Sequence, residues 1–199
     1  MAREELDSLL QRVAACRLCA DHLPLGPRPV VRMQSAARLL IIGQAPGTKV
    51  HETGIPWNDP SGNRLRDWLA LAPEDFYDET RIAIMPMGFC YPGRNPKGGD
   101  MPPRPECAPH WHDRLRSCLH GVELTLLVGS YAQKHYLGAA MARTMTDTVR
   151  DFRNHLENGF LPLPHPSWRS TAWLKRNPWF DSEVLPELRL RVADLMTTR

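Results

Sequence analysis

The stretch LLIIGQAPG, residues 39–47, predicts a buried strand that ends in a rigid turn. Four consecutive apolar side chains are typical of a strand that is covered on both faces, as strands of a parallel sheet are. Gly43 and Gly47 allow a close approach of the backbone, and Pro46 fixes the direction of the chain. We therefore expect backbone amides of this turn to point into a cleft.

Predicted strands and helices alternate along the rest of the chain. Apolar runs predict further strands at 81–87 and 122–130 and a short one at the start of 159–170, and helical spacing predicts helices at 4–15, 62–71, 110–120, 131–137 and 183–196. This order predicts an α/β fold, a three-layer α/β/α sandwich with a central, mainly parallel sheet. With 199 residues, of which 42% are hydrophobic, we expect a single domain over residues 1–199.

Ligand sites of such sheets lie at the carboxyl ends of the strands, where the connecting loops gather. Here the four strands run into the sequences GQAPG, GFCYPG, VGS and HPSW, so these four loops are expected to line one cleft. The second of them opens a segment rich in Gly and Pro, residues 88–107, and a loop of this length in a compact domain is usually functional.

Composition and charge narrow the class of protein. The formal net charge is +3, which permits a nucleic-acid partner without requiring one. The first residues do not have the pattern of a signal peptide, and no apolar run approaches the ~20 residues needed to cross a bilayer. We expect a cytoplasmic protein with no membrane partner, and a monomer.

Five cysteines in a reducing compartment indicate metal, cluster, catalytic or core roles rather than disulfides. Cys16 and Cys19 form a CxxC pair, and Cys90 and Cys107 lie on either side of the Gly/Pro-rich loop. Such a set can hold zinc or an iron–sulfur cluster, and the alternative is that some are buried core residues, as we expect for Cys118.

The HPSW sequence is the second candidate site. His165 leads a Pro-Ser turn in which the hydroxyl of Ser167 and neighbouring amides could hold a backbone phosphate. The pairing of this turn with GQAPG, each at the end of a strand of one sheet, makes both more significant than either alone.

LLIIGQAPG with TGIPWNDPSG, and PHPSW, resemble two motifs of the uracil-DNA glycosylase superfamily, and the four cysteines resemble the iron–sulfur branch of that superfamily. The resemblance implies a monofunctional DNA glycosylase of base excision repair, a hydrolase of N-glycosyl bonds with DNA as its partner. It also implies a [4Fe–4S] cluster as cofactor, held by Cys16, Cys19, Cys90 and Cys107; zinc, or no metal, is the alternative.

The resemblance also implies roles for individual residues. The backbone of Gly43, Gln44 and Ala45 would contact a flipped base, Trp57 would stack on it, and His165 would hydrogen-bond it and stabilise the departing anion. Ser61 would begin a helix near the DNA backbone, and Trp168 and Arg169 would lie on a loop that enters the minor groove.

Three positions differ from the family pattern. Gln44 and Ala45 stand where the family has Glu, or Asp or Asn, so the turn carries no carboxylate, and His51 or Glu52 is expected to position the water instead. Pro86 replaces an asparagine that reads the base, which leaves an apolar wall that includes Phe89.

Two other functions fit parts of the sequence. One is a DNA-binding protein on the same fold that has lost or repurposed its chemistry, as the missing acid allows. The other is a metal-dependent hydrolase that uses His51, His110, His112 and His165, although these histidines lack a tight ligand spacing. The tail STAWLKRNPWF, residues 170–180, is expected either to contact a DNA strand or to cover the sheet with its aromatic side chains.

Overall fold

The computed structural model describes residues 2–197, and the side chains of residues 5–197; residues 1, 198 and 199 lie outside this range. A four-stranded parallel sheet with strand order β2-β1-β3-β4 forms the centre of the fold. The strands are β1 (Leu39–Ile42), β2 (Ile82–Ile84), β3 (Leu124–Val128) and β4 (Phe160–Leu163). All four predicted strands are present.

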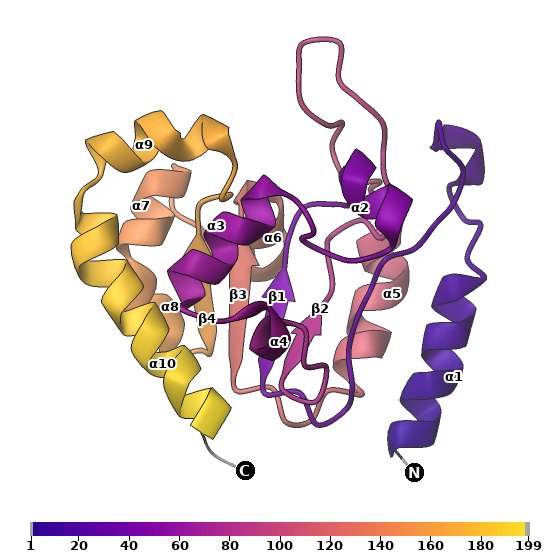
Figure 1. Cartoon of the computed structure of the whole chain (residues 1–199), viewed down its shortest axis with the longest axis horizontal. Coiled ribbons are helices and arrows are strands. Elements are labelled where there is room, and N and C mark those ends of the chain that lie inside the picture. Colours follow the sequence, from indigo (N-terminus) through magenta and orange to yellow (C-terminus); the bar gives the residue numbers. More distant parts are fainter. Residues whose placement is uncertain (1, 198–199) are drawn as a thin grey trace.

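Helices cover both faces of this sheet, as Figure 1 shows. Leu39 and Ile41 point to one face and Leu40 and Ile42 to the other, because side chains alternate along a strand. The first face packs against α3 (Pro60–Leu69), α4 (Pro73–Phe76), α7 (Met145–Arg150), α8 (Phe152–Leu156) and α10 (Leu185–Thr197). The second packs against α1 (Ala2–Ala14), α5 (Cys107–Arg116) and α6 (Ser130–Leu137). The fold is the predicted three-layer α/β/α sandwich.

Short elements that the apolar pattern does not predict complete the chain. Two of them are α2 (Thr48–Thr53), directly after the GQAPG turn, and α9 (Thr171–Arg176), after the HPSW sequence. Three turns of 3-10 helix span Ala20–His22, Gly138–Ala140 and Trp168–Ser170, and a π-helical turn spans Phe180–Val184. These elements have too few residues to show a helical period.

The tail after HPSW packs its aromatic side chains against the core, while most of its other residues are exposed. Phe180 is fully buried, and Trp173 and Trp179 pack against the same cluster on the first face of the sheet. The expectation that these aromatic side chains cover the sheet is confirmed. No helix in residues 2–197 combines the length and apolar character needed to cross a membrane.

Candidate active site

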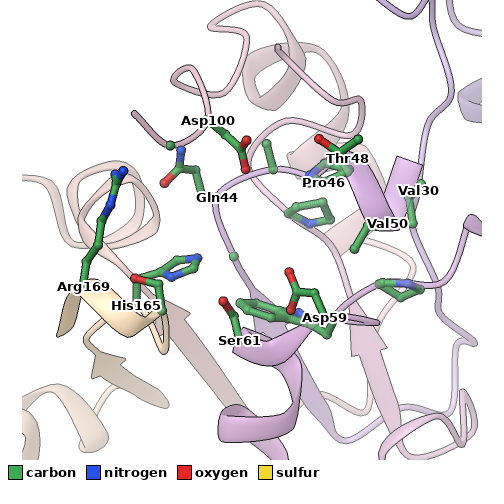
Figure 2. Close-up of a pocket in the computed structure, with 18 of the residues that line it drawn as sticks. Val30, Gln44, Pro46, Thr48, Val50, Asp59, Ser61, Asp100, His165 and Arg169 are labelled. Atoms are coloured by element: carbon green, nitrogen blue, oxygen red, sulfur yellow. The ribbon is translucent and has the colours of Figure 1, made fainter. Parts of the chain in front are cut away.

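A cavity of about 720 Å³ opens at the carboxyl ends of β1, β2 and β4. Figure 2 shows its walls: Gln44 and Asp100 lie on one side, Asp59 and Ser61 on the opposite side, and His165 and Arg169 on a third. The predicted site residues that line it are Gly43, Gln44, Ala45, Trp57, Ser61, His165, Ser167 and Arg169. Residues distant in the sequence therefore share one cavity, as the topology predicts.

The GQAPG turn is fixed by the two segments beside it. Gly43 O accepts a hydrogen bond from Met87 N–H at 2.9 Å, and Gln44 O accepts one from Gly88 N–H at 3.0 Å. The Gln44 side chain donates to Met101 O at 3.3 Å, in the Gly/Pro-rich loop. The turn is therefore held between the exit of β2 and that loop.

Trp57 is held in a strained backbone conformation over this turn. Its φ of 57° is in the left-handed region, which costs a residue other than glycine on the order of 1–3 kcal/mol. A Cβ at Gly43 would lie 2.7 Å from the indole, and a Cβ at Gly62 would lie 2.6 Å from the Trp57 carbonyl carbon. Glycine at both positions is what lets Trp57 lie in the cavity wall.

Arg66 and Tyr77 support the backbone that presents Trp57. Arg66 Nη1 donates to Trp57 O at 3.3 Å and to Tyr77 Oη at 3.2 Å, and Tyr77 Oη donates to Pro56 O at 3.0 Å. These hydrogen bonds fix the strained conformation, so the indole is positioned before any ligand binds.

His165 lies next to Trp57 in the cavity lining, with 5.8 Å between the ring centroids and 36° between the ring planes. Burial lowers the pKa of His165, and the charge of Asp59 raises it by a smaller amount. A neutral imidazole carries one N–H donor and one acceptor nitrogen. His165 can therefore donate a hydrogen bond to an anion that forms in the cavity.

The rest of the HPSW loop is tied to α3. Arg64 Nη1 donates to Ser167 O at 2.8 Å, and Ser170 Oγ donates to His165 O at 2.6 Å. Trp168, by contrast, is 76% exposed, with the Arg169 guanidinium 5.5 Å from its ring centroid. The Trp168 side chain is therefore largely exposed to solvent, although the loop that carries it is held by hydrogen bonds.

The structure places two predicted site residues away from the cavity. His51 lies on α2 with its ring 6.0 Å from that of Tyr91, and its Nδ1 is buried without a partner among the described residues. Phe89 is fully buried and stacks on His112, with 5.6 Å between centroids. Neither side chain lines the cavity wall.

The expectation that four strand ends line one cleft holds for three of them. The VGS sequence after β3 does not reach the cavity. Gly129, with a φ of 89°, instead lies behind His165, where a Cβ would be 3.5 Å from that of the histidine. The loop after β2 contributes Pro86 directly, and its more distant residues Arg94 and Gly98–Asp100 complete the wall.

Pro86 is positioned by a buried histidine. His112 Nε2 lies 3.1 Å from Pro86 O, and His112 Nδ1 lies 2.6 Å from Tyr136 Oη. Burial lowers the pKa of His112 to about 4 and raises that of Tyr136. The ring is therefore neutral, with Nε2–H donating to the carbonyl and Nδ1 accepting from the phenol.

Two carboxylates in the cavity were not among the predicted site residues. Asp59 caps α3, because its Oδ1 accepts a hydrogen bond from Gly62 N–H at 2.8 Å. Asp100 lies in the Gly/Pro-rich loop, next to the GQAPG turn, with its Oδ2 3.4 Å from the position of a Cβ on Gly47. A loop without periodicity gives no signal for such a contact.

The four cysteines at the CxxC and loop positions gather around a second, narrow cavity. It is lined by Cys16, Cys19, Cys90 and Cys107, whereas Cys118 packs in the core as expected. Burial is the largest cause that raises the pKa of Cys90 to about 11 and that of Cys107 to about 12. Within the described side chains, no group of three or more His, Cys, Asp or Glu is arranged to hold a metal ion.

The surroundings of these thiols supply hydrogen-bond donors in an apolar shell. Phe89 N–H donates to Cys107 Sγ at 3.4 Å. Trp111 lines the same cavity, is 5% exposed, and its buried Nε1–H has no acceptor among the described residues. Thiol ligands with N–H donors around them fit an iron–sulfur cluster, whose sulfurs accept such bonds.

Residues 32–189 match the family model of the uracil DNA glycosylase superfamily. This range contains the whole sheet, the predicted site residues of the first cavity, and Cys90 and Cys107. It begins after Cys16 and Cys19. A match over most of the chain, with both motifs at the carboxyl ends of the sheet, shows that this protein belongs to the uracil DNA glycosylase superfamily.

Proposed function

We propose that this protein is a monofunctional DNA glycosylase that hydrolyses the N-glycosidic bond of uracil or of another deaminated or damaged base. The observation that carries the proposal is that Trp57 and His165 line one cavity side by side, with 5.8 Å between their ring centroids. Trp57 offers an aromatic face for stacking, and His165 offers a hydrogen-bond donor. Members of the superfamily act on DNA, and base removal of this kind is the first step of DNA repair by excision.

The base reaches this cavity only when its nucleotide leaves the duplex, because stacking hides the glycosidic bond. The extruded base would stack on Trp57 and contact the backbone of Gly43, Gln44 and Ala45. As the bond breaks, its electron pair moves to the base, and negative charge develops on the base oxygens. His165 would donate to that oxygen, and donors positioned for developing charge supply the largest catalytic contribution in many enzymes.

The rim of the cavity supplies contacts to the DNA strand. Ser61 and Ser167 line it with hydroxyl groups, and Arg169 adds a positive charge. Trp168, exposed beside them, has the size and position of a wedge that fills the space left by the extruded base. Such a wedge offsets an unstacking cost of a few kcal/mol.

A panel of oligonucleotides, each with one uracil, hypoxanthine or xanthine, tests the proposal. We expect release of free base and an abasic site from at least one of them, in single-turnover reactions. His165→Ala should slow release about 10²–10³-fold, the loss typical of one donor to the transition state. His120→Ala, which changes an exposed histidine outside the cavity, should release base at the wild-type rate.

The absence of an acid in the GQAPG turn makes a binding protein the second candidate. Such a protein would bind single-stranded or damaged DNA in a salt-dependent way and release no base. Binding by the wild type with no base released from any substrate of the panel would support this second function and contradict the first.

We further propose that Cys16, Cys19, Cys90 and Cys107 hold a [4Fe–4S] cluster. Its support is the four thiols among the residues that line the second cavity, the hydrogen bond from Phe89 N–H to Cys107 Sγ, and the indole N–H of Trp111, which has no partner among the described residues. The cluster would serve a structural role, because it would tie the segment after α1 to both ends of the Gly/Pro-rich loop. None of these cysteines lines the Trp57–His165 cavity.

Metal and sulfide analysis of the purified protein tests the cofactor. We expect about four irons and four sulfides per chain, brown protein, and loss of both in Cys107→Ser. Cys118→Ser, a matched change at a buried cysteine outside the cavity, should keep the full iron content. One zinc per chain, or no metal, would contradict the proposal.

We also propose that the protein works in the cytoplasm as a monomer. Its five cysteines form no disulfide with one another, which suits a reducing compartment. Sedimentation of the protein with and without DNA would reveal any dimer.

A further inference from the structure

The turn that carries the family motif has no carboxylate, but other parts of the cavity lining do. Among the described residues that line it, two are acidic, Asp59 and Asp100. Figure 2 places them on opposite walls, with Asp100 on the side of Gln44. Asp59 already accepts the hydrogen bond from Gly62 N–H that begins α3, at 2.8 Å. Among the described residues, the Asp100 carboxylate accepts no such capping hydrogen bond.

Asp100 is held in place by a compact hairpin, residues 94–100. Arg94 and Asp100 pair as an antiparallel bridge, and the turn is closed by hydrogen bonds from Asn95 N–H to Gly99 O and from Gly98 N–H to Asn95 O, both 2.8 Å. The bond from Gln44 to Met101 O anchors the chain directly after Asp100 to the GQAPG turn. In Figure 1 this segment belongs to the long loop that rises beyond α2.

The hairpin also packs against the HPSW loop. A Cβ on Gly99 would lie 2.9 Å from Arg169 Cζ, and one on Gly98 would lie 3.1 Å from Arg169 Nη2. Both glycines have a positive φ, which is 95° at Gly98 and 81° at Gly99. Because these two glycines have no side chain and a left-handed backbone, the hairpin packs directly against the Arg169 guanidinium. This contact with the HPSW loop helps to fix the position of the hairpin that carries Asp100.

The charges around Asp100 come from three elements. Arg94 on the hairpin and Arg169 on the HPSW loop favour its ionised form, and Asp59 at the start of α3 disfavours it. Asp100 keeps contact with solvent in the open cavity, but partial loss of hydration is the largest influence and raises its pKa. A carboxylate with a raised pKa is a better proton acceptor than a fully hydrated one.

We propose that Asp100 positions and deprotonates the water that attacks the sugar, in the role for which the GQAPG turn has no acid. This inference rests on the proposed glycosylase function. The water oxygen forms a bond to C1′ while the C1′–N bond breaks and leaves its electron pair on the base. One water proton passes to an Asp100 oxygen, and the carboxyl group then returns it to the base anion or to solvent. The ionised carboxylate also stabilises positive charge on the sugar as the bond lengthens.

The test compares Asp100→Asn and Asp100→Glu with the wild type, as full chains on the DNA substrate that the wild type cleaves. Asp100→Asn should slow single-turnover base release about 10²–10⁴-fold while DNA binding is kept, because the amide cannot accept the proton. Asp100→Glu should recover part of the rate. Asp75→Asn, the same change at an exposed residue of α4, should leave the rate unaltered.

A pH profile separates this role from a structural one. The wild-type rate should fall at low pH as Asp100 takes up a proton, and this contribution should be absent in Asp100→Asn.

Three results would overturn the inference. If Asp100→Asn releases base at the wild-type rate, Asp100 has no part in the reaction and the glycosylase function stands. If the variant is slow but keeps the complete wild-type pH profile, its effect is structural. If the wild type releases no base from any substrate, the proposed function and this inference fall together.

Discussion

The ring centroids of Trp57 and His165 lie 5.8 Å apart in the lining of one cavity, and buried neighbours hold both side chains. Gly43 and Gly62 leave room for the indole and for its backbone, while Gly129 packs behind the histidine. Both rings are thus fixed in the cavity lining. We therefore expect substitutions at residues that support these side chains to change the rate of base release, even where the residue does not contact the base.

Gly62→Ala should displace Trp57. Alanine is preferred to glycine within a helix by about 1 kcal/mol, so a substitution in α3 without a collision would stabilise the protein. Here the new Cβ meets the Trp57 carbonyl group, and we expect a loss of about 1–3 kcal/mol in the free energy of unfolding and slower base release. Denaturant unfolding and single-turnover kinetics check both. A variant as stable and as fast as the wild type would contradict this role of Gly62.

Tyr77→Phe should weaken the support of Trp57 without touching the cavity. It removes the hydrogen bonds to Pro56 O and from Arg66, which together stabilise the fold by about 1–3 kcal/mol. We expect lower stability and slower base release. Tyr131→Phe, at a 40% exposed tyrosine, is the matched control and should change neither quantity. Equal behaviour of the two variants would show that the Tyr77 hydroxyl does not support Trp57.

His112 should make the fold less stable in acid. Its pKa is about 4 in the folded protein and about 6.5 in the unfolded chain, so below pH 6.5 the unfolded chain takes up a proton that the folded protein does not. The stability present above pH 6.5 is lost as the pH falls to 4, and it amounts to roughly 3 kcal/mol at about 1.4 kcal/mol per pH unit.

His112→Gln isolates this contribution. Its amide can donate to Pro86 O and accept from Tyr136 Oη, but it does not titrate. Urea unfolding at several pH values should show a shallower fall in stability between pH 6.5 and 4 for the variant than for the wild type. Parallel curves for the two proteins would refute the assignment.

Gly99→Ala should move the 94–100 hairpin away from Arg169. The added Cβ would meet the guanidinium, and a φ of 81° adds strain. We expect slower base release and weaker DNA binding, measured by fluorescence anisotropy. Gly26→Ala is the control, because Gly26 has a φ of 75° and nothing within 4 Å of a new Cβ. If both variants lose the same activity, backbone strain and not the contact with Arg169 is the cause.

Periodic and local signals in the sequence predicted much of this structure. The four strands, five of the helices that cover them, and the convergence of Gly43 and His165 follow from apolar runs and from parallel topology, whereas α4, α7 and α8 do not. The cysteines gather as their spacing suggests. Each of these features depends on residues whose place in the fold follows from the apolar periodicity of the sequence or from a position at the end of a strand.

The features that sequence reasoning missed depend on contacts across the fold. Phe89 turns inward because it stacks on His112, which belongs to α5. Asp100 reaches the cavity because two glycines let its hairpin pack on Arg169. The left-handed backbone of Trp57 depends on Gly62 and Arg66, which follow it in α3. The periodicity of the sequence does not predict contacts of this kind between residues of different elements.

The most direct test of the central claim is the release of free uracil from an oligonucleotide with a single uracil, by the wild type and by Trp57→Ala and His165→Ala. If these two rings form a glycosylase pocket for uracil, the wild type converts the substrate to free uracil and an abasic site, and either substitution slows that conversion at least about tenfold. Binding of the oligonucleotide with no uracil released, or equal release by all three proteins, would contradict the claim for this base.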